Sequence, residues 1–147
     1  MTERQAPSAL FKPWIGKKCS DIVRHEYSWQ FSFPPAGSVT IESFWRITLD
    51  HRVVLCSFDD GKKFDLPEHV DAAQAAKELI FDEVVQAVRV NDNGDLIVSF
   101  ENEANLEILI NSRMYESWNA ASWSESKKLL IVATGGGALT IFEDGQT

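Results

Sequence analysis

The chain has 147 residues, enough for one domain with a hydrophobic core and too few for two ordinary domains. Apolar residues make up 44% of it, which argues against disorder, and no apolar run reaches the roughly 18 residues of a membrane span. The net charge of −8 argues against nucleic acid as a partner, because phosphate binding needs a basic patch.

The N-terminal residues 1–12 mix polar residues with Ala and Pro and show no periodicity, so we predict a flexible tail. This segment also lacks the basic-then-apolar order of a secretory signal peptide, which favours a cytoplasmic location. Trp14-Ile15-Gly16 follows as an apolar anchor with a turn behind it. The rest of the chain reads as a single domain.

A first β unit is predicted over residues 14–64. Between residues 23 and 33 apolar and polar residues alternate, which is the period of a half-buried strand. A second strand is predicted over residues 39–49. Residues 52–58 are apolar on both faces, which favours a central strand. The inward face of the first strand is expected to carry Val23, His25, Tyr27, Trp29, Phe31 and Phe33.

One α-helix is predicted within residues 65–80, running from about residue 67 to residue 79. Asp65 is a suitable N-cap, Pro67 fits the first helical turn, and Glu68 stands three residues after the cap, as in a capping box. Apolar residues then recur at helical spacing from Val70 onward. This helix would link the first β unit to a second one.

The second β unit is predicted over residues 84–142. Residues 84–110 contain three alternating runs separated by two polar turns, with Leu96, Val98 and Phe100 facing inward on the middle strand. A less regular version of this pattern occurs in the first half of the chain, where residues 30–41 match residues 97–108. The repeat suggests a duplicated unit.

These elements predict an α+β fold that is mainly β. Two related antiparallel β-meanders would pack as a sandwich or a partly open barrel, with one linking helix at about residues 67–79. An exposed strand edge of such a fold offers a route to a homodimer.

The motifs that suggest chemistry have simpler explanations. Strand-like residues follow the triple glycine at 135–137, whereas a phosphate-binding loop needs a helix there. The three histidines are far apart and lack metal-site spacing, and Cys56 lies in an apolar run where a small buried hydrophobe is expected. No nucleophile motif is present. We therefore predict no enzymatic activity, no cofactor and no bound metal.

Aromatic and acidic residues in the second half favour a protein partner. Residues 1–74 carry 9 basic and 10 acidic side chains, whereas residues 75–147 carry 5 and 12, giving net charges of −1 and −7. Such an acidic surface suits either simple solubility or a basic partner. Trp118 and Trp123 lie among polar residues, where both core packing and exposed recognition are open alternatives. The predicted partner-binding residues are Tyr115, Glu116, Trp118, Trp123, Glu101, Glu103 and Glu107.

Four short motifs in residues 79–142 point to a known family. They are the hairpin at 93–100, the strand at 105–108, the segment 115–118, and a glycine pair with a following strand at 136–142. In these features the chain resembles a family of small, two-repeat, β-rich bacterial proteins classed as a domain of unknown function, number 6188. The chain has Thr134-Gly135 where that family usually has proline before the glycine pair. The resemblance implies no functional residues, because the family has no established activity.

The sequence thus predicts a non-catalytic binding protein of the bacterial cytoplasm. Its ligand would be a protein partner, and the acidic second half of the chain favours a basic one. Neither nucleic acid nor a membrane is expected as a partner. Immunity to a co-encoded toxin is the most concrete form of this prediction, by analogy with other small acidic proteins. The alternative is a β domain that binds a small ligand in a pocket lined by Tyr27, Trp29 and Trp45.

Overall fold

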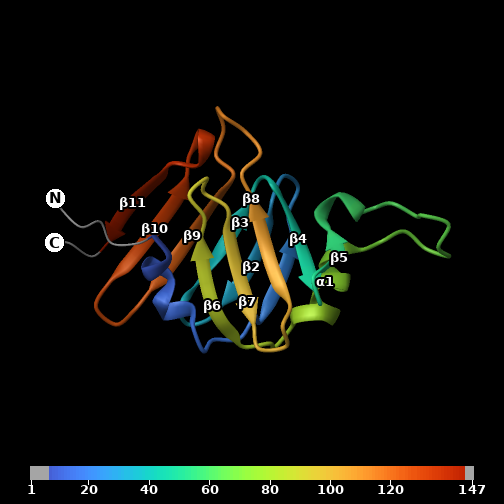
Figure 1. Cartoon of the computed structure of the whole chain (residues 1–147), viewed down its shortest axis with the longest axis horizontal. Coiled ribbons are helices and arrows are strands. Elements are labelled where there is room, and N and C mark those ends of the chain that lie inside the picture. The colour runs from blue at the N-terminus through green and yellow to red at the C-terminus, as the bar shows by residue number, and fades with distance from the viewer. Residues whose placement is uncertain (1–6, 145–147) are drawn as a thin grey trace.

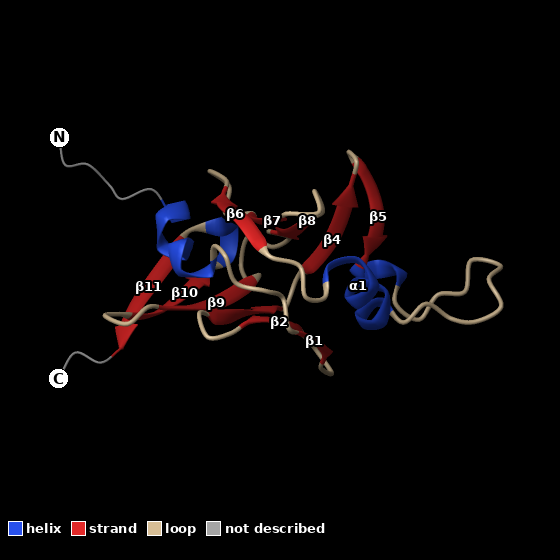
Figure 2. Ribbon diagram, turned by 90° about the horizontal axis from the view of Figure 1, so that it is seen from below, coloured by secondary structure: helices blue, strands red, loops and turns tan. Residues whose placement is uncertain are grey.

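The computed structural model describes residues 7–144, which form two antiparallel β-sheets packed face to face with one short α-helix beside them (Figures 1 and 2). The helical elements are η1 (Pro7–Trp14), η2 (Ser57–Asp59), α1 (Ala72–Ile80) and η3 (Gly135–Gly137). The strands are β1 (Asp21–Arg24), β2 (Trp29–Phe33), β3 (Gly37–Ile41), β4 (Phe44–Leu49), β5 (Arg52–Cys56), β6 (Val85–Val90), β7 (Leu96–Phe100), β8 (Asn105–Leu109), β9 (Trp118–Trp123), β10 (Lys128–Ala133) and β11 (Leu139–Asp144).

The predicted mainly-β sandwich is confirmed, and no closed barrel forms. One sheet has six strands in the order β1-β2-β3-β9-β10-β11, and the other has five in the order β5-β4-β8-β7-β6. Each sheet therefore contains strands from both halves of the chain, so neither predicted β unit makes a sheet by itself. No helix in the described part of the chain is long and apolar enough to cross a membrane.

The two halves of the chain exchange strands in the same way: the strand that follows each repeated hairpin joins the sheet of the other hairpin. The β2–β3 and β7–β8 hairpins correspond to the internal repeat seen in the sequence. After β3 the chain crosses to the other sheet, where β4 pairs with β8; after β8 it crosses back, and β9 pairs with β3. As a result Trp45 lies opposite Ile108 in one sheet, and Trp118 lies opposite Ile41 in the other.

The core between the sheets follows the two-residue period of the strands. In β2 and β3 every second residue is buried, and Leu96, Val98 and Phe100 of β7 are buried as predicted. Alternate Cβ atoms point to opposite faces of a sheet, so this pattern directs one face of each strand inward. The largest fully buried side chains are Trp14, Trp45, Trp118, Phe11, Phe31, Phe33 and Phe100.

The predicted strand over residues 23–33 is two strands separated by a turn. The amide of His25 donates a hydrogen bond of 2.8 Å to the carbonyl oxygen of Ser28, and this bond closes the turn between β1 and β2. His25 and Tyr27 are consequently exposed and do not face the core as expected; Tyr27 is 82% exposed. Apolar and polar residues happen to alternate through the turn as well, so the sequence pattern alone does not reveal the turn.

Residues 52–58 also differ from the prediction, because β5 is an edge strand and its run ends in η2. Only Leu55 is fully buried, while Val53 and Val54 are about half exposed. Apolar residues on both faces of a strand indicate a central strand only where other parts of the protein cover both faces of the sheet. Within the described residues, β5 has a neighbour on one side alone and packs against α1.

The helix begins later than predicted, at Ala72. Its N-cap is Asp71, whose Oδ1 accepts a hydrogen bond of 3.1 Å from the amide of Gln74. Asp65 instead has a left-handed backbone with φ of 60°, which is incompatible with the extended conformation of a cap. Residues 60–71 form the long loop on the right of Figure 1.

The predicted flexible tail of residues 1–12 is wrong for residues 7–12, whereas residues 1–6 lie outside the described part of the chain. Residues 7–12 belong to η1, which buries Phe11 and Trp14 against β6 and β9. The indole Nε1 of Trp14 donates a hydrogen bond of 3.1 Å to the carbonyl oxygen of Ala121. Two large aromatic residues thus hold this segment on the sandwich.

Candidate functional site

Several loops meet at one end of the sandwich, which we call the loop end: residues 25–28, 42–43, 57–58, 91–95 and 110–117. The loop of residues 110–117 stands at the top of Figure 1. The amides of Glu42 and Ser43 both donate to the carbonyl oxygen of Ser117, at 2.9 and 3.1 Å. The amide of Ile110 donates to Oδ1 of Asp95 at 2.8 Å. These bonds tie together loops from both halves of the chain.

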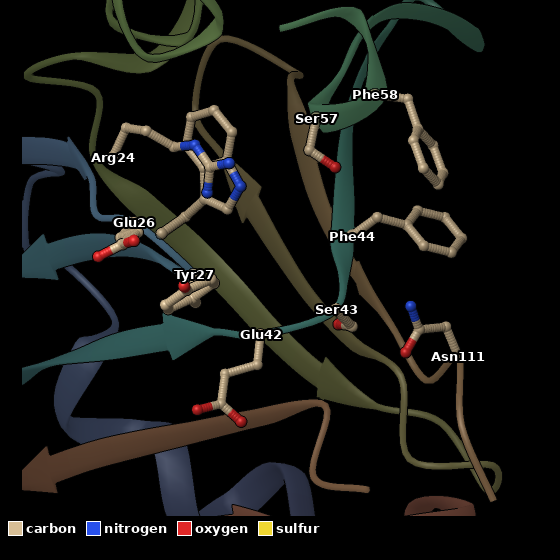
Figure 3. Close-up of a pocket in the computed structure, with 10 residues that line it drawn as sticks. Arg24, Glu26, Tyr27, Glu42, Ser43, Phe44, Ser57, Phe58 and Asn111 are labelled. Carbon is tan, nitrogen blue, oxygen red and sulfur yellow. The ribbon is translucent and has the colours of Figure 1, made fainter.

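A surface pocket of about 370 Å³ opens at the loop end (Figure 3). It forms where the chain leaves β3 for β4, so that residues from the β1–β2 turn, the crossover and η2 face one another. The loop of residues 110–117 contributes Asn111. The lining residues are Arg24, Glu26, Tyr27, Trp29, Glu42, Ser43, Phe44, Ser57, Phe58 and Asn111.

The walls of the pocket are largely aromatic. On one side the guanidinium of Arg24 lies over the ring of Trp29, with its Cζ atom 4.5 Å from the ring centroid. On the opposite side Phe44 and Phe58 pack with their centroids 5.2 Å apart (Figure 3). Tyr27 stands exposed at the rim. A flat π face attracts a cation, and Arg24 over Trp29 and Lys62 over Phe58, 5.9 Å from the ring centroid, already make such contacts within the chain. The rings of Tyr27 and Phe44 remain for a positively charged group of a ligand.

The polar groups of the pocket also favour a cation. Arg24 is matched by Asp60, since its Nε lies 3.7 Å from Oδ2 of Asp60. Glu26 and Glu42, in contrast, form no ion pair with any residue of the described range 7–144. The hydroxyl of Ser43 is buried and has no hydrogen-bond partner there. The pocket therefore offers two exposed carboxylates to which a cationic group can donate hydrogen bonds.

The aromatic pocket predicted from Tyr27, Trp29 and Trp45 is not the one that forms. The rings of Trp29 and Trp45 pack edge to face, with centroids 5.1 Å apart, and Trp45 is fully buried and does not line the pocket. Tyr27 and Trp29 border a different, more open pocket. Sequence reasoning missed the residues that complete it, because nothing in the strand pattern shows that the chain changes sheets at Ser43.

Only two of the predicted partner-binding residues are exposed at the loop end. Tyr115 is 77% exposed and Glu116 is exposed, and both belong to the loop that supplies Asn111 to the pocket. The prediction that Trp118 binds a partner is wrong. Its side chain is fully buried, and its Nε1 donates to the carbonyl oxygen of Gly94 at 2.9 Å. Its polar sequence neighbours conceal an inward strand position.

The remaining predicted residues lie elsewhere. Trp123 is 44% exposed but ends β9, at the opposite end of the strand from Trp118 and away from the loop end. Glu101 and Glu103 are exposed in the turn between β7 and β8, at the bottom of Figure 1. Glu107 lies in β8 and pairs with Arg46 of β4. The structure thus does not gather the three glutamates with Tyr115.

The two thiols are free and differ in environment. Cys19 is fully buried, whereas Cys56, expected to be a buried hydrophobe, is partly exposed. Burial raises the pKa of the Cys19 thiol to about 12, and burial also raises the pKa of Cys56. Desolvation disfavours the thiolate, which is the nucleophilic form, so neither thiol is activated.

We expect thiol labelling of the native protein with a disulfide reagent at pH 8 to modify Cys56 and leave Cys19 unmodified. The raised pKa keeps Cys19 protonated in the folded state, and its burial blocks access. Above pH 9 the unfolded chain ionises this thiol while the folded protein does not, so its burial lowers stability as the pH rises toward 12. Cys56→Ala should abolish native labelling, and equal labelling of both thiols would contradict the assignment.

Within residues 7–144 no group of three or more His, Cys, Asp or Glu side chains is arranged to hold a metal ion. One protein family matches residues 13–143, and its description reads "Family of unknown function (DUF6188)". This match confirms the resemblance seen in the second half and extends it through the first. No curated protein and no solved structure matches the chain.

Proposed function

The chain belongs to the DUF6188 family of unknown function, and on that premise we propose that it is a non-catalytic binding protein of the bacterial cytoplasm. Its loop end would bind a basic protein partner, with a lysine or arginine side chain of the partner entering the pocket. The observation that carries this proposal is the pocket itself. Glu26 and Glu42 line it together with aromatic residues, and their carboxylates have no ion-pair partner among the described residues.

Aromatic and carboxylate groups act together on a cation. The ring faces attract the charge, and a partly desolvated cation–π contact contributes about 0.5–2 kcal/mol. The carboxylates accept charge-assisted hydrogen bonds, which are stronger than neutral ones. Arg24, stacked on Trp29 and paired with Asp60, illustrates the same recognition within the chain.

The surroundings of the pocket suit a protein ligand. Exposed Tyr115 is of a residue type that often anchors interfaces, and Glu116 adds negative charge beside it. The overall charge of −8 would speed encounter with a basic partner. Neutralisation of a basic toxin encoded with this chain is the most concrete form of the proposal.

A pull-down from lysate of the native host, eluted with a salt gradient, tests this proposal. The wild-type chain is expected to retain a basic protein that moderate salt releases. The double variant Glu26→Lys/Glu42→Lys should lose that protein by at least about tenfold, because the reversal replaces attraction with repulsion. Glu101→Lys/Glu103→Lys is the matched control, since it makes the same charge change away from the loop end and should keep the partner.

Two results would count against the proposal. Equal loss in both double variants would show that net charge alone governs binding, and equal retention in both would exclude the pocket. A small-ligand role is the second candidate, since a volume of about 370 Å³ is sufficient for a small molecule. It would gain support if the chain retained no protein while N-acetyl-arginine amide, but not the neutral citrulline analogue, shifted the indole NMR signal of Trp29.

A further inference from the structure

Among the described residues that line the pocket at the loop end, Arg24 alone is positively charged, whereas Glu26 and Glu42 are negatively charged. Guanidinium and carboxylate groups form charge-assisted hydrogen bonds, so an arginine beside two carboxylates is expected to pair with one of them. Arg24 pairs instead with Asp60, which does not line the pocket: its Nε lies 3.7 Å from Oδ2 of Asp60. The choice that Arg24 makes therefore decides whether the two glutamates are available to a ligand.

The backbone places Arg24 within reach of both glutamates, which are drawn with it in Figure 3. Glu26 is two residues further along the chain, in the turn between β1 and β2. In the six-stranded sheet Arg24 lies opposite Trp29, and Trp29 lies opposite Ile41, the residue before Glu42. Neighbouring strands are about 4.8 Å apart, so roughly 10 Å separates the backbones of Arg24 and Glu42. The long side chains of arginine and glutamate can bridge such a distance.

Three contacts hold the guanidinium of Arg24 at the wall of the pocket. Its Cζ lies 4.5 Å from the centroid of the Trp29 ring, its Nη1 donates to the carbonyl oxygen of Ser28 at 3.4 Å, and its Nε faces Asp60. Of these three partners, only Asp60 carries a full negative charge. Asp60 therefore competes directly with Glu26 and Glu42 for Arg24.

The backbone holds Asp60 in place for this contact. Oδ1 of Asp60 accepts a hydrogen bond of 2.9 Å from the amide of Ala72, the first residue of α1, and the amide of Asp60 donates to the carbonyl oxygen of Ser57 at 3.2 Å. A side chain that is already fixed loses little further conformational freedom when it pairs. Glu26 and Glu42 are exposed, so pairing with them would cost more of this freedom.

We propose that Asp60 is a specificity-determining residue of the pocket at the loop end. Asp60 holds Arg24 against Trp29 and so prevents it from neutralising Glu26 and Glu42, whose carboxylates stay available for a cationic group of the ligand. Without Asp60, Arg24 would take the place of the partner's lysine or arginine side chain. This role rests on the proposed function, and it adds to the site a residue that does not line the pocket.

An NMR titration of the full chain with N-acetyl-arginine amide, followed through the indole signal of Trp29, tests this role. Asp60→Asn keeps an oxygen for the amide of Ala72 but removes the charge that holds Arg24. The Kd is expected to rise by about threefold, a modest change because exposed ion pairs are weak. In an Arg24→Gln background the same substitution should change the Kd by less than about 1.5-fold, since no internal cation is left to compete.

Asp82→Asn is the matched control. It removes the same charge from an exposed ion pair of the same length, because Nζ of Lys18 lies 3.7 Å from Oδ2 of Asp82, and neither residue lines the pocket. The Kd should stay within about 1.5-fold of the wild-type value. If Asp60→Asn does not give the circular dichroism spectrum of the folded wild type, Asp60→Ser replaces it, because a serine hydroxyl also accepts from a helix amide.

A measurement without ligand follows the same contact. Protons above an aromatic ring resonate upfield, so the Nε–H signal of Arg24 should be shifted upfield in the wild type and should lose this shift in Asp60→Asn. An unchanged Arg24 signal would overturn the inference and leave the loop-end hypothesis standing, as would equal effects of Asp60→Asn with and without Arg24. A wild-type chain that binds neither the arginine amide nor a basic protein would overturn both.

Discussion

Replacing Trp118 by alanine is expected to lower the free energy of unfolding by about 3–5 kcal/mol. The side chain is fully buried, and its indole Nε1 bonds to the carbonyl oxygen of Gly94, which belongs to a different hairpin. Alanine would leave a cavity between the sheets and an unpaired carbonyl group, and both effects destabilise the native state. Urea unfolding followed by circular dichroism would measure the change.

Trp123→Ala is the matched control for this variant. It removes the same atoms from the other end of β9, where the indole is 44% exposed and lies near the ammonium of Lys128. A loss of no more than about 1 kcal/mol is expected there, since little apolar surface returns to water. Comparable losses for the two variants would contradict the assignment of Trp118 to the core and Trp123 to the surface.

Gly37→Ala is expected to destabilise the protein by at least about 3 kcal/mol. Gly37 starts β3 with φ of 139°, a conformation that residues with a side chain rarely adopt. A Cβ atom added at this position would lie 1.9 Å from the carbonyl oxygen of Ala121 in β9. The two strands would have to separate, which would disturb the junction between the halves of the six-stranded sheet.

Gly61→Ala isolates the conformational part of that cost. Gly61 also has a positive φ, 78°, but a Cβ atom added there would meet no atom within 4 Å. Only the backbone penalty of about 1–2 kcal/mol is then expected. Thermal unfolding of both variants by calorimetry makes the comparison; if Gly37→Ala costs no more than Gly61→Ala, the close approach of β3 and β9 does not limit the substitution.

The local parts of this fold follow from the sequence because they depend on residues near one another. The alternation in residues 96–100 and the polar turns around it predict the β7–β8 hairpin, and the internal repeat relates it to β2–β3. A period of two residues has a direct structural cause in the pleat of a strand. Hairpins and inward faces were therefore predictable in this part of the chain.

The exchange of strands between sheets was not predictable in the same way. Only Glu42 and Ser43 separate β3 from β4, and neither is a proline or glycine that would mark a break. What fixes the crossover is the carbonyl oxygen of Ser117, which accepts from both amides and belongs to the other half of the chain. Such long-range bonds leave no periodic signal in the sequence.

The candidate site was predictable only in part for the same reason. Tyr115 and Glu116 stood out by residue type in a polar segment, and they belong to the loop that reaches the pocket. Glu26 and Glu42 looked like ordinary polar positions, and only the turn before β2 and the crossover after β3 place them together. Trp118 shows the opposite error, since residue type suggested a surface role while its strand position directs it inward.

The exchanged strands also determine when the protein can fold. Strand β3 pairs on one side with β2, but its other neighbour, β9, comes only in the last part of the chain, after five further strands. During synthesis, the edge of β3 stays unpaired until the ribosome has released β9. Contacts between residues so far apart in the sequence slow folding. Apolar strands whose edges are still unpaired are prone to aggregate. We therefore expect slow, chaperone-assisted folding of the nascent chain, despite its small size.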